Sequence, residues 1–269
     1  MQVTIEINDL PYEAKVALAK DERTSSEVLD KLANDGISVV RWAVAENENT
    51  FAKTLANLAN DINVNVRSAV GVNKNTKAET LAMLASDKEG LVRQAVAYNE
   101  NTPDELLFVL AKDKDIDVCC AVAKNKNTPV ELLAVLAQDE DYWVRWAVAE
   151  NRSTPTDMLA VLAKDDVYEV RTAVAANGNT SVDVLVMLAT DEDYHVREAV
   201  AENKNTPANI LTMLAQDKDA DVRYEVTKNP NTPYKTLVML SHDTEFWVEK
   251  NAKKLLKEHK KKEKNNIER

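Results

Sequence analysis

Residues Asn34–Ala59 read NDGISVVRWAVAENENTFAKTLANLA, and this 26-residue pattern recurs along the chain without insertion or deletion. Further copies begin at positions 60, 86, 112, 138, 164, 190 and 216, while a looser copy begins at Asn8 and a truncated one at His242. A fixed period of about 20–50 residues is typical of a solenoid, in which each repeat packs on its neighbours. Because nine full repeats sample each position, constant positions indicate packing and variable positions indicate tolerance or function.

The chain has 269 residues and a formal net charge of −11, with +5 in residues 249–269 and −16 in the rest. An acidic body repels nucleic acids and anionic lipids and favours basic partners. No stretch reaches the roughly 18–20 apolar residues that span a membrane, and the N-terminal sequence lacks a signal-peptide pattern. Two adjacent cysteines are not a disulfide framework. We therefore expect a cytoplasmic protein, with a monomer favoured, that binds neither membranes nor nucleic acid on its acidic body.

The repeat at residues 86–111 predicts two short helices, and its first half shows the first of them. Apolar residues from Val92 to Val96, followed by Asn99, have the i, i+3, i+4, i+7 spacing of one helix face. We expect Asp87 to cap the start of this helix. Asn99 suits the left-handed position that ends a short helix. Two such helices are not stable alone, so stacking must supply the core.

The second half of the same repeat predicts the second helix. Thr102-Pro103-Asp104-Glu105 has the pattern of a capping box with Pro in the first turn. The same Thr occurs in all nine full repeats. Because the residues that follow are apolar on most sides, we expect this helix to be buried between its neighbours.

Constant columns identify the scaffold. Two Leu columns run from Leu29 to Leu237 and from Leu32 to Leu240 in steps of 26 residues. Each fully buried Leu contributes about 1.5–3 kcal/mol. An Asp opens every repeat, and six residues later an Arg stands at positions 41, 67, 93, 145, 171, 197 and 223. This spacing predicts an Asp–Arg ladder between adjacent repeats. An Asn column, from Asn47 to Asn229, is expected to cap helices or to bond the backbone.

The pattern Asp-x4-Val-Arg-x-Ala-Val-Ala-x-Asn-x-Asn-Thr-Pro-x-x-Leu-Leu-x-x-Leu-Ala resembles the leucine-rich-repeat variant family and is similar to short HEAT-like repeats. The resemblance covers nearly the whole chain and implies an all-α, right-handed α-solenoid, in which one helix of each pair can be 3₁₀. One type in that family carries a cysteine-rich iron–sulfur segment before the repeats. No such segment is present here, so we expect no cluster and no other cofactor.

The variable residues on the first helix form one stripe, called the variable stripe below. Its three positions per repeat lie one before the Val, one after the Arg and one before the Asn. At about 100° per residue they share a face roughly 130° from the buried one. All four tryptophans fall in this stripe, which stacking does not demand. Resemblance to HEAT-like solenoids places the stripe along the concave groove.

The variable stripe is therefore the candidate binding surface. Trp and Tyr are enriched at binding hot spots, and aromatic faces hold cations. Acidic residues outnumber basic ones along it, which predicts a protein or extended peptide bearing Lys or Arg beside apolar anchors. The candidate partner-binding residues are Trp42, Glu46, Tyr98, Trp143, Trp146, Glu150, His195, Glu198, Tyr224 and Trp247. The alternative is that the tryptophans cover the groove by packing across adjacent repeats.

Catalysis and metal binding have little support in the sequence. There are three His, no phosphate loop and no nucleophile–base pair, so we expect no catalytic residues. Cys119 stands where the ladder expects Arg, and no further Cys or His is near it and Cys120, so no metal site is expected. Two alternatives remain for the function. One is an enzyme on a HEAT-like scaffold, of the bilin lyase or DNA glycosylase type, and the other is a purely architectural spacer.

The register also predicts the domain organisation. We expect one solenoid domain over 1–269, with an N-terminal cap at 1–7 and nine repeats at 8–241. A partial tenth repeat at 242–269 would carry a Lys-rich capping helix and tail.

Overall fold

The computed structural model describes residues 7–267. Each full repeat contributes one helix of nine residues, called a long helix below, and one of seven, called a short helix. The long helices are α1 (Tyr12–Lys20), α3 (Ser38–Glu46), α5 (Val64–Val72), α7 (Gly90–Tyr98), α9 (Ile116–Lys124), α11 (Tyr142–Glu150), α13 (Tyr168–Ala176), α15 (Tyr194–Glu202) and α17 (Ala220–Lys228). The short helices are α2 (Ser26–Leu32), α4 (Ala52–Leu58), α6 (Ala78–Leu84), α8 (Asp104–Leu110), α10 (Val130–Leu136), α12 (Thr156–Leu162), α14 (Val182–Leu188), α16 (Ala208–Leu214) and α18 (Tyr234–Leu240). A 3₁₀ helix, η1 (Ile7–Asp9), comes first and α19 (Phe246–Ile267) comes last.

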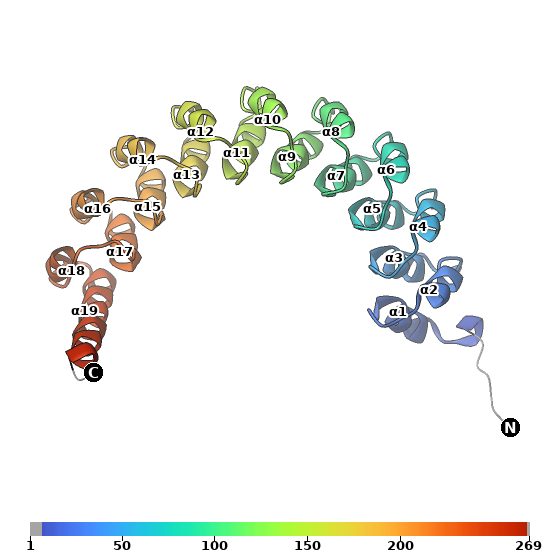
Figure 1. Cartoon of the computed structure of the whole chain (residues 1–269), viewed down its shortest axis with the longest axis horizontal. Coiled ribbons are helices and arrows are strands. Elements are labelled where there is room, and N and C mark those ends of the chain that lie inside the picture. Colours follow the sequence, from blue (N-terminus) through green and yellow to red (C-terminus); the bar gives the residue numbers. More distant parts are fainter. Residues whose placement is uncertain (1–6, 268–269) are drawn as a thin grey trace. The chain divides into compact units, whose positions relative to one another are not determined.

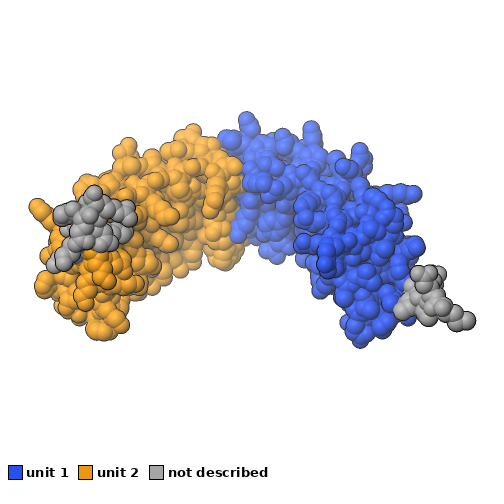
Figure 2. All heavy atoms as spheres, turned by 60° about the horizontal axis from the view of Figure 1, so that its bottom comes forward, with its two compact units in different colours: residues 1–136 blue, residues 137–269 orange. Residues whose placement is uncertain are grey.

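The chain divides into two compact units, residues 1–136 and 137–269 (Figure 2). Within each unit, consecutive long helices pack closely in one layer, and each short helix packs on the long helices beside it (Figure 1). In unit 2, α19 packs on α17 and α18. The predicted all-α repeat solenoid is thus confirmed. Its right-handedness and its single-domain organisation stay predictions, and the predicted cap at 1–7 lies outside the described residues except for Ile7.

The core of each unit is built from the constant columns. Every Leu of the two predicted columns is buried, and so are the valines that precede the Arg column, such as Val92 and Val170. The prediction that the short helices are buried on most sides is wrong, because Val109 is 63% exposed and Val161 is 68% exposed. A short helix contacts the long-helix layer through its Leu face and leaves its other side in solvent.

The helix type also differs from what the family resemblance allows. Both helices of each repeat are α-helical, and within residues 7–267 the 3₁₀ conformation is confined to Ile7–Asp9. The 3₁₀ helix that the family resemblance allows in each pair is therefore not found in the described repeats.

The predicted Asp–Arg ladder is confirmed within each unit. Nε and Nη2 of Arg67 donate to the two carboxylate oxygens of Asp87 in the next repeat, at 2.6 and 3.0 Å. Nη1 donates to the backbone oxygen of Asp61 at 2.8 Å. Lys15 takes the Arg position in the first repeat and pairs with Asp35 at 2.9 Å. The remaining Arg pairs join Arg41, Arg93, Arg145, Arg171, Arg197 and Arg223 to the next Asp.

The ladder Asp does not cap the helix, which corrects the expectation for Asp87. Its carboxylate accepts from the backbone N–H of Glu89 at 3.0 Å and thereby forms the turn before α7. Glu89, two residues later, is the N-cap residue of α7. The Asp side chain is therefore shared between a turn in its own repeat and the Arg of the repeat before it.

The Thr column closes the long helix instead of opening the short one. Thr102 Oγ1 donates to the backbone oxygen of Val96 at 2.6 Å. Pro103 is the N-cap residue of α8, and no side-chain hydrogen bond caps that helix. The predicted capping box is therefore wrong. The reason is that the last carbonyls of a helix lack intrahelical donors, and the Thr hydroxyl lies within reach of one of them.

The Asn column joins repeats and does not adopt the left-handed conformation predicted for it. Asn99 is extended, with φ −69° and ψ 122°, and no described residue has a positive φ. Its Nδ2 donates to the backbone oxygens of Gly71 and Asn73 in the preceding repeat, at 2.7 and 3.0 Å. Its Oδ1 accepts from the backbone N–H of Asn101 at 2.9 Å. The same pair of donated hydrogen bonds joins Asn47, Asn73, Asn125, Asn177, Asn203 and Asn229 to carbonyls at the end of the previous long helix, so these side chains are not available to a ligand.

Cys119 lies on α9 at the ladder position, and we expect faster amide exchange around it. Its Sγ lies 3.4 Å from the backbone oxygen of Asp113. A thiol cannot form the bidentate carboxylate pair that an Arg forms, so residues 113–122 should be less protected than residues 87–96 around Arg93. Native-state hydrogen exchange with mass spectrometry checks this expectation. Equal protection of the two segments would contradict it.

Candidate functional site

The variable stripe lies on the solvent side of the long helices in both units. Trp143 and Trp247 are each 47% exposed, and Trp42 and Trp146 are half-buried. By contrast, Val40 and Val44 of α3 and Val144 and Val148 of α11 are buried completely. The tryptophans therefore do not belong to the Leu–Val core of either unit.

In unit 1 the stripe residues of α3 and α5 together line a hollow of about 450 Å³. Trp42 and Glu46 contribute from α3, and Ser68 and Val72 from α5. These residues come from two successive repeats and occupy positions predicted to share one face. The predicted stripe is thus a continuous surface at this place.

The ring of Trp42 already contacts a cation of its own chain. Lys20, at the end of α1, has its Nζ 5.0 Å from the centroid of the Trp42 ring. Glu46 lies one turn after Trp42, and burial raises its pKa, although the charge of Lys20 opposes that rise. The arrangement shows that an ammonium fits over this ring beside a carboxylate.

In unit 2 the first helix, α11, presents an aromatic cluster. The rings of Trp143 and Trp146 meet edge to face with centroids 5.6 Å apart, and Tyr142 lies 4.8 Å from Trp143. Edge-to-face pairs hold aromatic rings in fixed relative positions. Glu150 follows one turn after Trp146 and is exposed. The cluster therefore offers a rigid, half-exposed apolar surface next to a carboxylate.

His195 is held between two tyrosines of unit 2. Its ring stacks on Tyr168 of α13 at 5.4 Å and lies 3.9 Å from Tyr194. Its Nδ1 is 3.0 Å from a carboxylate oxygen of Asp193. One turn later, burial raises the pKa of Glu198, and the negative charges of Glu225 and Asp221 raise it further. The surroundings of His195 and Glu198 are therefore rich in negative charge.

A hollow of about 990 Å³ lies along the same layer, over α13 and α15. Its surface includes the small residues Ala173, Ala176 and Ala199, with Glu150 and Glu202 among the other lining residues. Arg152 and Lys204 also line it, from the turns that follow the long helices. Small apolar residues with carboxylates beside them suit the aliphatic stem and charged end of a Lys or Arg side chain.

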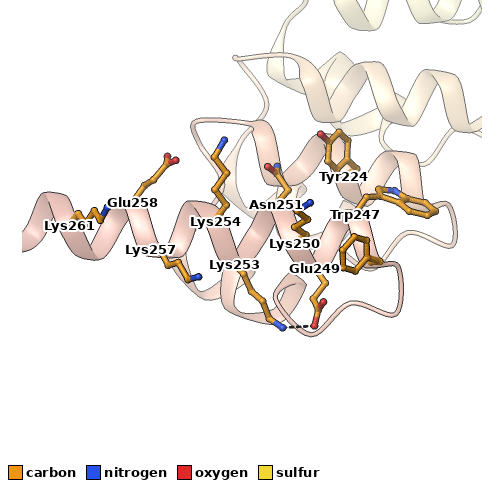
Figure 3. A pocket seen from close by; sticks show the side chains of 11 residues that line it. Tyr224, Trp247, Glu249, Lys250, Asn251, Lys253, Lys254, Lys257, Glu258 and Lys261 are labelled. Atoms are coloured by element: carbon orange, nitrogen blue, oxygen red, sulfur yellow. Dashed lines mark hydrogen bonds and ion pairs between the residues drawn. The ribbon is translucent and has the colours of Figure 1, made fainter.

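Trp247 lies in different surroundings from the other tryptophans. Together with Tyr224 it lines a hollow of about 880 Å³ whose other residues come mainly from α19 (Figure 3). Five lysines and two glutamates line this hollow, so its net charge is positive. Acidic residues outnumber basic ones along the stripe as a whole, whereas the stripe is basic around Trp247.

The structure brings some of the predicted residues together and separates others. Trp143, Trp146 and Glu150 share α11, and Tyr224 and Trp247 share one hollow. Tyr98 is 44% exposed on α7 and is not among the residues that line the hollow of Trp42. Lys20 and Lys254 are not among the binding residues predicted from the sequence. Lys254 follows Lys228 by 26 residues, so the repeat register alone could have placed it in the stripe.

Metal-type clusters and membrane-spanning helices are not found among the described residues. Among them there is no group of three or more His, Cys, Asp or Glu that could hold a metal ion. None of the helices in residues 7–267 has the length and apolarity to cross a membrane.

The two-layer stack of helix pairs defines the class of protein, an all-α repeat solenoid. Residues 168–193 and 194–219 match the model of the family "Leucine rich repeat variant". These two matches, with the same register in the other repeats, support the resemblance to leucine-rich-repeat variants that the sequence pattern indicates. A search of curated proteins finds no match.

One solved structure agrees on the fold. This similar structure is described as a leucine-rich repeat variant with a novel repetitive protein structural motif. It is 24% identical over 82% of this chain and 87% of that chain, with a TM-score of 0.59. An engineered protein is 18% identical over 95% of this chain and 96% of its own, with a TM-score of 0.40. Importin beta is 14% identical over 90% of this chain and 34% of its own, with a TM-score of 0.28.

Proposed function

We propose that this chain is a non-catalytic scaffold that binds an extended segment of another protein along the variable stripe. The observation that carries the proposal is the position of the four tryptophans, which are half-buried or exposed on the stripe while the core is built from Leu and Val. Large aromatic side chains at half-exposed positions are the residues that dominate protein interfaces. The stacking of repeats gives no reason for them.

The chemistry beside the rings supports a partner with Lys or Arg. The Lys20 ammonium over Trp42 is an internal example of the contact that a partner would make. Glu150 lies beside the Trp143–Trp146 pair, and Glu198 and Glu202 lie on α15. An extended segment that contacts several such points gains affinity from each of them, as in other multipoint interactions.

Replacing Trp143 and Trp146 together by Ala should remove specific partners while the fold is retained. Truncating a binding hot spot costs about 2 kcal/mol or more, which is at least about thirtyfold in affinity. The measurement is a quantitative comparison of proteins captured from lysate by the native chain and by the variant, with circular dichroism as the check of folding.

Phe108→Ala is the matched control, because Phe108 is a 40% exposed aromatic residue on the short helix α8, away from the stripe. It should retain every partner that the native chain captures. If the double Trp variant also retains them all, the stripe is not the binding surface. If both variants alter only stability, the chain is an architectural spacer.

A further inference from the structure

We propose that the segment bound along unit 2 is charge-polarised, with a Lys- or Arg-bearing part over α13–α17 and an Asp- or Glu-bearing part over α19. This inference rests on the proposed function and adds the nature and order of the charges on the partner. It follows from a reversal of charge along the variable stripe within unit 2.

The reversal is visible in the stripe positions themselves. From α11 to the start of α17 their charged residues are acidic, and from the end of α17 onward they are basic. The acidic ones are Glu150, Glu169, Glu198, Glu202 and Asp221, and the basic ones are Lys228, Lys250 and Lys254. A segment that is uniformly basic would therefore meet repulsion at α19, and one that is uniformly acidic would meet repulsion at α15.

The acidic part of the stripe, from α11 to the start of α17, has more carboxylates than cations. Glu225 stands where earlier repeats have Ala, and its Oε1 accepts from Lys228 Nζ at 2.7 Å. Its other oxygen is buried and has no hydrogen-bond partner. Burial raises the pKa of Glu198, and the nearby negative charges of Glu225 and Asp221 raise it further. A cation from a partner would relieve this repulsion, because an opposite charge favours the ionised carboxylates.

The basic part combines lysines with aromatic rings. Lys250, Lys254, Lys257 and Lys261 follow one another at spacings of four, three and four residues, which aligns them along one face of α19. In Figure 3, Lys253 pairs with Glu249, and Lys254 extends on the other side of the helix. Beside them Phe246 and Trp247 are 67% and 47% exposed. Carboxylates next to an apolar residue fit this combination.

The distance between the two parts sets the length of the segment. Packed helices lie about 8–10 Å apart, so α15 and α19, with α17 between them, are about 16–20 Å apart. An extended chain covers about 3.3 Å per residue, so about five or six residues separate the centres of the two charged parts. A nucleic acid could contact only α19, because the carboxylates of α15 and α17 repel phosphates.

Two synthetic peptides of identical composition test the inference against the native full-length chain. In the block peptide, a Lys- and Leu-containing half is joined by a short Gly–Ser linker to a Glu- and Leu-containing half. In the mixed peptide, Lys and Glu alternate. Fluorescence anisotropy at low salt should show that the block peptide binds at least about tenfold more tightly, which corresponds to about 1.4 kcal/mol. Equal affinities would overturn the inference.

Charge-reversal variants of the protein test which half of the block peptide lies over which helices. Lys254→Glu with Lys257→Glu should weaken the block peptide about tenfold and should not weaken a peptide made of the basic half alone. Glu198→Lys with Glu202→Lys should weaken the binding of both the block peptide and the basic half alone. The control, Lys164→Glu with Lys235→Glu, makes the same change in net charge as the α19 variant, at exposed positions outside the stripe, and should alter neither affinity.

The outcomes separate the inference from the proposed function. If the basic half binds and depends on Glu198 and Glu202, but the α19 variant does not affect the block peptide, the polarised partner is wrong and the scaffold function stands. If neither the block peptide nor the basic half binds, both the polarised partner and the proposed scaffold function fail. If an oligouridylate binds α19 more tightly than the block peptide does, that end recognises nucleic acid and the inference is overturned.

Discussion

Replacing Arg93 by Met should lower the free energy of unfolding by about 3 kcal/mol, because it leaves a buried carboxylate without its cation. Arg93 is 7% exposed, and its Nε and Nη2 donate to both carboxylate oxygens of Asp113 at 2.6 and 2.7 Å. Its Nη1 also donates to the backbone oxygen of Asp87 at 2.8 Å. Urea unfolding followed by circular dichroism should show a midpoint lower by about 1 M or more, given typical denaturant slopes.

The control for this variant is Arg23→Met. Arg23 also pairs with an Asp, Asp21, at 2.8 Å, but its side chain is 90% exposed, so its loss should leave the midpoint nearly unchanged. If the two Arg variants behave alike, the ladder does not contribute to stability.

Lowering the pH provides a second control for the effect of Arg93→Met on stability. The hydrogen bond from Arg93 lowers the pKa of Asp113 although burial opposes it. Since the folded-state pKa is lower than the unfolded value of about 3.9, the stability from this carboxylate is present above that pH and is lost as the pH falls through the folded-state pKa. The native chain should lose stability in that pH range. The difference in the free energy of unfolding between the native chain and the Arg93→Met variant should therefore become smaller. A difference that is constant from pH 7 to pH 3 would contradict this account.

Replacing Asn99 by Ala should destabilise the chain by about 2–4 kcal/mol, since it leaves several buried backbone groups unsatisfied at once. The Asn99 side chain is the donor to the backbone oxygens of Gly71 and Asn73 and the acceptor for the backbone N–H of Asn101. Each unsatisfied buried group costs about 1–3 kcal/mol. Urea unfolding measures the effect.

Asn101→Ala is the matched control for Asn99→Ala. Asn101 Nδ2 also donates to the preceding repeat, to the backbone oxygen of Lys74 at 2.6 Å, but at an exposed position where water can replace it. Asn99→Asp should be at least as damaging as Asn99→Ala, because it places a carboxylate against two carbonyl oxygens. An Asn99→Asp variant as stable as the native chain would show that the two donated hydrogen bonds are unimportant.

The sequence predicted the scaffold where residue type and spacing leave one solution. The Leu columns must be buried at helical spacing, and an Asp with an Arg six residues later can form a ladder across repeats. The roles of Thr102 and Asn99 could not be predicted in this way. A hydroxyl or an amide can bond its own helix, the next helix or the preceding repeat, and only the distances between helices decide among these partners.

The candidate stripe was predictable because the repeat register separates it from the core. Its internal contacts were harder to predict. Lys20 lies 22 residues before Trp42, and nothing in the local pattern joins them. The basic character around Trp247 was missed because the lysines of α19 read as a charged terminal helix rather than as a continuation of the stripe.

The direction of the contacts between repeats has an evolutionary consequence. Each Arg donates forward to the Asp of the next repeat, and each Asn donates backward to carbonyls of the previous one, as Arg67 and Asn99 show. Within a unit, repeats that carry both residues therefore offer identical connections at their two ends, and such a copy can be duplicated or deleted without leaving mismatched partners. The repeat with Cys119 in place of Arg is an exception. The gene can change the length of the protein in steps of one repeat, and recombination can bring new combinations of stripe residues into one chain while the connections are kept.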